Sequence, residues 1–116
     1  MIKAIKNLFL KGYILKHKIP LIKEDSLIRL HLVFIGKVQR VGFRDQIRIM
    51  AEMMNITGYV RNIGTNKVVS ELQGNKEYLD FLVKVIKAEK RFILESVLID
   101  QIGIVNKEMK FVIIKI

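Results

Sequence analysis

Residues 30–54, LHLVFIGKVQRVGFRDQIRIMAEMM, join a short apolar run to an amphipathic segment through a loop bounded by two glycines. The apolar run, residues 30–35, has the length of a strand and ends at Gly36. Residues 43–54 repeat apolar side chains at helical spacing and carry charged ones on the other faces. The apolar positions of this segment are Phe43, Ile47, Met50, Ala51 and Met54. We therefore predict a strand, a loop and a helix in succession, with Asn55 ending the helix.

The chain after this helix predicts a hairpin. Residues 57–62 and 68–73 favour strands, and the five residues between them include Gly64 and Asn66, which tolerate positive φ. Asn75 is then a candidate N-cap. It precedes a second helix whose recurring positions are Tyr78, Leu79, Leu82, Val85, Ile86 and Glu89.

Two further strand-like runs, residues 93–104 and 109–116, complete the chain, with residues 105–108 joining them. The resulting order is β-α-β-β-α-β with one additional terminal strand. That order is typical of the split βαβ, or ferredoxin-like, α/β sandwich. We therefore predict an α+β fold in which two helices cover one face of an antiparallel sheet.

The N-terminal part of the chain differs from the rest. Residues 1–28 carry six lysines against two acidic residues, with a weak helical stripe that Pro20 interrupts. We interpret residues 1–28 as a basic extension and residues 29–116 as the domain. The extension is a frayed appendage, an added element packing on the domain, or an amphipathic segment that contacts a partner or membrane.

The composition limits the classes of function. The 116 residues carry 21 basic and 11 acidic side chains, a formal charge of +10, which attracts anions in general. No basic cluster interleaves with aromatic residues as in RNA-binding proteins, so contact with nucleic acid or an acidic membrane surface is left to residues 1–28. No run is apolar enough to cross a bilayer, and no signal peptide is recognised. With no cysteine and no paired histidines, we expect a cytoplasmic protein without a metal site.

Residues 36–44, GKVQRVGFR, place a glycine-bounded loop before the first helix. The first N–H groups of a helix lack intrahelical partners, and the helix dipole adds about half a positive charge there. Such a loop can wrap its amides around a tetrahedral anion, and Arg44 adds a planar fork of donors suited to phosphate oxygens. Residues 36–44 are therefore a candidate site for a phosphate-sized anion, although most glycine loops before a helix only turn the chain.

This loop resembles the phosphate loop of the acylphosphatase family, whose pattern is G-x-V-Q-G-V-G/C-F-R. Residues 57–62, TGYVRN, are similar to a second motif of that family, T/V-G-W/Y-V-R/K-N. Val68, Gln73-Gly74 and residues 111–113 fit its later strands and the start of its second helix. The resemblance covers residues 29–116, and two spaced motifs in the right structural context are not expected by chance.

The resemblance implies an acylphosphatase, which hydrolyses acyl phosphates to a carboxylate and inorganic phosphate without metal or cofactor. By position, Arg44 matches the arginine that binds the phosphoryl group, and Asn62 matches the asparagine that orients the attacking water. The resemblance also implies a phosphate-binding loop made of Val38, Gln39, Arg40, Val41, Gly42, Phe43 and Arg44. The substrate implied is a small carboxyl-phosphate anhydride. Because this anhydride has a good leaving group, positioning and charge stabilisation can suffice for its hydrolysis.

Two positions depart from the family pattern, and a third places an acidic side chain next to Arg44. Arg40 and Asn66 stand where glycine is usual. If position 40 needs positive φ, its arginine costs about 1 kcal/mol and distorts the loop; otherwise Arg40 adds charge near the anion. We expect the side chain of Asp45 to point away from a phosphate. The alternative function is therefore a catalytically weakened domain that binds an anion or a partner.

Overall fold

The computed structural model describes residues 26–115, so most of the expected N-terminal extension lies outside the described residues. The elements run β1 (Leu27–Lys37), α2 (Phe43–Met53), β2 (Thr57–Ile63), β3 (Lys67–Asn75), α3 (Lys76–Ala88), β4 (Ile93–Ile102) and β5 (Phe111–Ile114). This is the predicted order with its additional terminal strand. Neither helix is long and apolar enough to span a membrane in the part of the chain described.

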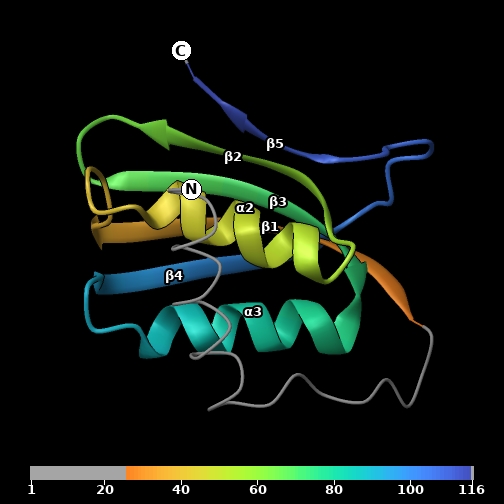
Figure 1. Ribbon diagram of the computed structural model, residues 1–116, viewed down its shortest axis with the longest axis horizontal. Helices are drawn as coiled ribbons and strands as arrows, with labels where there is room; N and C mark the ends of the chain where they lie inside the picture. The colour runs from red at the N-terminus through yellow and green to blue at the C-terminus, as the bar shows by residue number, and fades with distance from the viewer. Residues whose placement is uncertain (1–25, 116) are drawn as a thin grey trace.

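The five strands form one sheet in the order β4-β1-β3-β2-β5. Strands β1 to β4 pair antiparallel, as expected, whereas β5 pairs parallel to β2, so the whole sheet is mixed. Helices α2 and α3 lie side by side over one face of the sheet (Figure 1). The α+β ferredoxin-like sandwich predicted from the order of elements is thereby confirmed.

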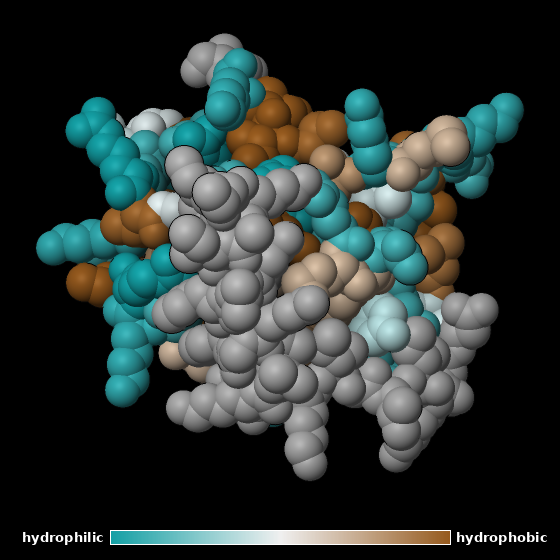
Figure 2. Space-filling view, in the orientation of Figure 1, coloured by the Kyte–Doolittle hydropathy of each residue, from teal (hydrophilic) through white to brown (hydrophobic). Residues whose placement is uncertain are grey.

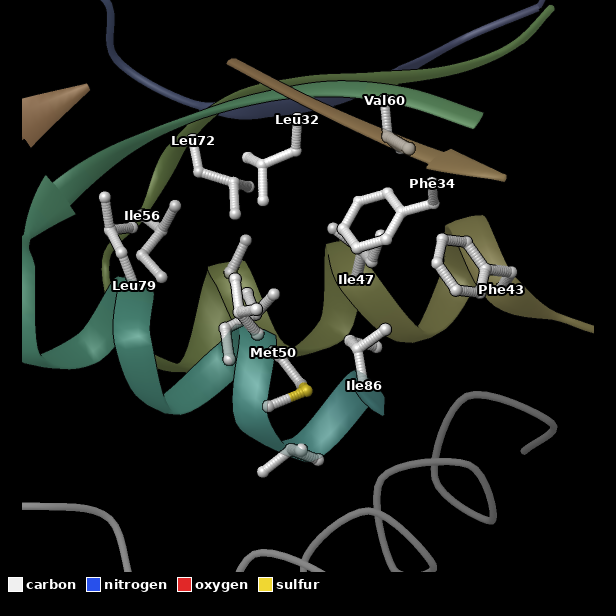
Figure 3. Close-up of a cluster of buried hydrophobic side chains, with 14 of the residues drawn as sticks. Leu32, Phe34, Phe43, Ile47, Met50, Ile56, Val60, Leu72, Leu79 and Ile86 are labelled. Carbon is white, nitrogen blue, oxygen red and sulfur yellow. The ribbon is translucent and has the colours of Figure 1, made fainter. Parts of the chain in front are cut away.

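The core fills the space between the two helices and the sheet (Figure 3). Strands contribute side chains such as Leu32, Phe34 and Leu72, none of which has measurable exposure. The predicted stripes of both helices are confirmed, because their apolar members are buried, except for the half-buried Tyr78, which packs against the core. The predicted N-cap is confirmed too, since Asn75 Oδ1 accepts a hydrogen bond of 2.9 Å from the Glu77 amide.

Strand β1 is longer than its apolar run. It begins at Leu27, inside the expected extension, and ends at Lys37 because it pairs with strands on both sides. Its pairing with β4 shifts register between Ile35 and Gly36. A Cβ on Gly36 would lie 2.1 Å from the carbonyl oxygen of Ile93, so only glycine permits this close approach.

The connection between β4 and β5 is longer than expected, residues 103–110 in place of 105–108, and a polar network on the face opposite the helices holds it. Arg29, only 2% exposed, donates through Nη1 and Nη2 to both carboxylate oxygens of Glu108, at 2.8 and 3.2 Å. Its Nε donates to Glu71 at 2.7 Å. Gln73 exchanges two hydrogen bonds with the backbone of Val105, at 2.8 and 2.9 Å. Because these bonds join residues distant in sequence, no local pattern predicts where β4 ends.

Charge and hydrogen bonding shift the pKa values within this network. Burial alone would raise the pKa of Glu108, but the hydrogen bond and charge of Arg29 outweigh it and lower that pKa. The pKa of Glu71 is lowered in the same way, against burial, by Arg29 and Tyr59. Burial and the hydrogen bond to Glu71 raise the pKa of Tyr59. Both carboxylates are therefore held in their charged form.

Candidate functional site

The loop between β1 and α2, the hairpin between β2 and β3, and the last residues of β5 lie toward the same end of the molecule, at the left of Figure 1. Helix α2 starts there with Phe43, whose buried ring contacts Phe34 and Phe92 edge to face at centroid distances of 5.0 and 4.7 Å. These contacts fix the first turn of the helix against the core. Arg44 follows directly and is only partly buried.

The helix has no side chain capping its N-terminus. Gly42 takes the N-cap position with φ 78°, a left-handed conformation that favours glycine, and its carbonyl accepts from Gln46 N at 3.1 Å. Within residues 26–115, none of the backbone N–H groups of residues 39–44 donates a hydrogen bond to the chain. These amides and the positive end of the helix dipole are available to an anion.

The loop is tied to the hairpin by Gln39. Its Nε2 donates to the carbonyl oxygens of Gly64 and Lys67, both at 3.0 Å, and more weakly to that of Ile63 at 3.4 Å. The amide of Gly36 donates to the carbonyl of Asn66 at 2.9 Å. The side chain of Gln39 thus connects the loop to the end of β2.

Two hollows meet at this end of the molecule. The smaller, about 160 Å³, is lined by Val38, Arg40, Gly42, Phe43, Arg44, Asp45, Ile113 and Lys115. The larger, about 380 Å³, is lined by Arg44, Arg61, Asn62, Ile114 and Lys115. Arg44 and Lys115 line both, so the two hollows adjoin. The structure therefore brings together Arg44 and Asn62, which lie 18 positions apart in the chain.

Asn62, which lines the larger hollow, carries a buried polar atom without a partner among the described residues. Its Oδ1 is buried and has no hydrogen-bond partner among the described residues. A buried acceptor without a partner costs about 1–3 kcal/mol, so such atoms mark places where a small donor is expected to bind. Asn62 precedes the last residue of β2 and faces the same side of the sheet as Val60, toward the helices.

Two predicted loop residues lie outside the hollows. The side chain of Gln39 donates hydrogen bonds to the hairpin, and Val41 packs against the core. Arg40 lines the smaller hollow with φ 63°, which is the left-handed conformation that the glycine of the family pattern suits. Asp45 also lines that hollow and lies 3.5 Å from Arg48, to which it is ion-paired.

Arg61 and Lys115 are residues of the site that sequence reasoning missed. Arg61 belongs to the second motif, which draws attention to its position without giving it a role. Lys115 follows β5, and nothing local distinguishes it from other lysines; it reaches the site because β5 pairs with β2. Hydrophilic side chains project from this left-hand side of the molecule in Figure 2.

No cluster suited to a metal ion occurs in the described residues, where no three His, Asp or Glu side chains gather to hold one. Asp45 is the one acidic side chain among the residues lining either hollow. The site is therefore a cationic pocket with backbone amides on one side and a side-chain amide on the other. Such a site suits a tetrahedral anion and a water molecule beside it.

Comparison with known proteins agrees with this class of site. The family model described as Acylphosphatase matches residues 30–113. An acylphosphatase of Trichormus variabilis is 33% identical over 61 residues, 53% of this chain and 60% of that protein. One from Geobacillus kaustophilus is 36% identical over 64 residues, 55% of this chain and 68% of that protein. The acylphosphatase structure from Bacillus subtilis has a TM-score of 0.70 at 21% identity, covering 78% of this chain and all of that one.

The chain belongs to the acylphosphatase family, because the family model spans well over half of it. In sequence it aligns with about 60% of the length of the first curated relatives. The structural likeness, at its low identity, bears on the fold alone.

Proposed function

We propose that the protein is an acylphosphatase, which hydrolyses acyl phosphates to a carboxylate and inorganic phosphate without a metal. The observation that carries the proposal is that Arg44 and Asn62 line one hollow, and that the buried Oδ1 of Asn62 has no hydrogen-bond partner among the described residues. Membership of the family supports the same reaction. A cytoplasmic location is part of the proposal, in keeping with a sequence that contains no cysteine.

The phosphoryl group binds in the smaller hollow. The free amides of residues 39–44 and the guanidinium of Arg44 surround its oxygens, and the helix dipole favours its negative charge. These donors are fixed before the substrate arrives, since Phe43 anchors the helix start and Gln39 anchors the loop. Preorganised donors of this kind stabilise the charge that builds up on the equatorial oxygens during transfer.

Asn62 orients the nucleophile. Its buried Oδ1 accepts a hydrogen bond from a water, which holds the water oxygen toward phosphorus. The water oxygen forms a bond to phosphorus while the bond from phosphorus to the acyl oxygen breaks, and the electron pair leaves with the carboxylate. A water proton passes to a phosphate oxygen, so the products are a carboxylate and dihydrogen phosphate or its conjugate base. Because the leaving group is a carboxylate, no strong general base is needed.

The alternative, a domain that binds an anion without turnover, is not favoured by the family or the relatives. It depended on Arg40 distorting the loop. Arg40 adopts φ 63° within a loop that Gln39 still ties to the hairpin. The left-handed residue at position 40 is therefore compatible with the hydrogen bonds that tie the loop to the hairpin.

Release of phosphate from benzoyl phosphate by the purified full chain tests the proposal. We expect turnover in metal-free buffer, and the same rate after addition of a chelator. Turnover that stops in chelator and returns with a divalent ion would exclude the metal-free reaction. A rate equal to spontaneous hydrolysis would exclude the enzyme assignment altogether.

A further inference from the structure

The larger hollow has room and chemistry beyond what a phosphoryl group requires. It measures about 380 Å³ against about 160 Å³ for the hollow at the loop, and Arg44 lies in the wall of both. A phosphoryl group held at the loop therefore leaves the rest of its substrate in the larger hollow. The side chains of that hollow decide which acyl groups fit.

Those side chains are mostly cationic. Besides Arg44, the larger hollow is lined by Arg61 and Lys115, with Ile114 as the apolar residue, and no described acidic residue lines it. Two cations elsewhere in the protein show how a nearby carboxylate compensates such a charge: Arg29 pairs with Glu108 at 2.8 Å, and Lys76 pairs with Asp80 at 2.7 Å.

Arg61 and Lys115, by contrast, form neither an ion pair nor a side-chain hydrogen bond with any residue in the range 26–115. A neutral acyl group would leave both charges uncompensated beside it. An anionic group would neutralise the two positive charges. A guanidinium can bind a carboxylate through two parallel hydrogen bonds.

We propose that Arg61 and Lys115 select acyl phosphates whose acyl part carries a second anionic group. The phosphoryl group binds at the loop, the carbon skeleton passes Ile114, and the second anion binds between Arg61 and Lys115. This inference rests on the proposed hydrolysis and concerns the acyl group, not the phosphoryl transfer itself. Arg61 and Lys115 are specificity residues in this scheme, and Arg44 and Asn62 carry the reaction.

The test compares 4-carboxybenzoyl phosphate with 4-methylbenzoyl phosphate. The two differ in charge at one end, and the para position prevents the carboxylate from attacking its own anhydride. We expect the ratio of their kcat/KM values to fall about tenfold in Arg61→Gln and in Lys115→Gln, mainly through KM, because one charge-assisted hydrogen bond is lost. The ratio should also fall with added salt. Lys84→Gln, an equal loss of charge on the exposed face of α3, should keep the wild-type ratio.

If both substrates turn over and neither variant changes the ratio, the inference is overturned while the proposed function stands. If neither substrate turns over, the proposed function fails, and binding decides the inference. In that case calorimetry with 4-carboxybenzylphosphonate and 4-methylbenzylphosphonate replaces turnover. Tighter binding of the carboxylated compound, lost in Arg61→Gln, supports the inference, and equal binding of the two compounds overturns it.

Discussion

Arg44 and Asn62 act on different parts of the proposed reaction, although they line the same hollow. Arg44 binds an anion that is present in both the ground state and the transition state. In the proposed reaction, Asn62 Oδ1 contacts the attacking water and not the phosphoryl group. The two side chains should therefore be separable by kinetics.

We expect Arg44→Ala to lower kcat/KM of benzoyl phosphate at least about 100-fold and to weaken competitive inhibition by inorganic phosphate. Asn62→Ala should lower kcat by about 100-fold while phosphate still inhibits, because the anion site is intact. Steady-state kinetics with a phosphate inhibition series measure both effects, with Lys84→Ala as the control. Phosphate inhibition lost equally in the two variants would contradict the division of roles.

Arg40 tests whether a left-handed residue in the loop is tolerated. Glycine reaches φ 63° without the crowding that an arginine side chain causes, so Arg40→Gly should raise the free energy of unfolding by up to about 1 kcal/mol. The same change removes a cation from the smaller hollow and should raise the inhibition constant of phosphate several-fold. Urea unfolding and inhibition assays measure these effects. A large gain in kcat would show that Arg40 distorts the loop of the natural protein.

At the scale of elements, the site depends on three segments that meet because of the fold. Helix α2 supplies the dipole and Arg44, β2 supplies Asn62, and the residue after β5 is Lys115. The loop before α2 and the hairpin after β2 are joined by Gln39. We therefore expect this side chain to fix the position of the proposed anion site relative to Asn62.

Removing this connection should impair function more than stability. Gln39→Ala should lower the free energy of unfolding by about 1 kcal/mol, since its bonds reach carbonyl groups that solvent can satisfy in its absence. We expect kcat/KM to fall about tenfold, because the loop amides and Asn62 lose their fixed relation. Gln101→Ala, on exposed β4, is the matched control. A tenfold loss of activity in the control as well would contradict the local explanation.

In the molecule as a whole, the network around Arg29 lies on the face of the sheet opposite the helices and holds the connection between β4 and β5. Glu108 lies on the connection that leads into β5, and Arg29 lies in the central part of the sheet. The lowered pKa of Glu108 means that folding stabilises its charged carboxylate relative to the protonated form. Its contribution to stability is complete above the unfolded pKa of about 4.3 and is lost as the pH falls through the lower, folded pKa.

Glu108→Gln should therefore destabilise the protein at pH 7 and have little effect in strong acid. We expect a loss of about 2 kcal/mol at pH 7, as for other hydrogen bonds between charged groups. Urea unfolding of both proteins between pH 7 and pH 2 measures the difference. It should narrow below about pH 4.3 and vanish once Glu108 is protonated in the folded state. A difference that stays constant down to pH 2 would contradict the assignment to this carboxylate.

Much of the architecture could be read from local patterns. The stripe of α2, the cap at Asn75 and the order of elements all follow from side-chain spacing, because burial of one helix face repeats every three to four residues. The loop of residues 36–44 stood out because it resembles the phosphate loop of the family and precedes a predicted helix, where an anion can bind. The sequence alone thus determined the fold class, the family resemblance and the two principal site residues to be tested.

Only the tertiary structure decided what completes the site. The parallel pairing of β5 with β2 places Ile114 beside Arg61 and brings the following Lys115 to the same hollow. Contacts from Arg29 and Gln73 hold the connection between β4 and β5. Such contacts join residues far apart in the chain, so the local spacing of side chains does not predict them. The unpartnered Oδ1 of Asn62 is likewise a property of its folded surroundings, since an exposed asparagine would be satisfied by water.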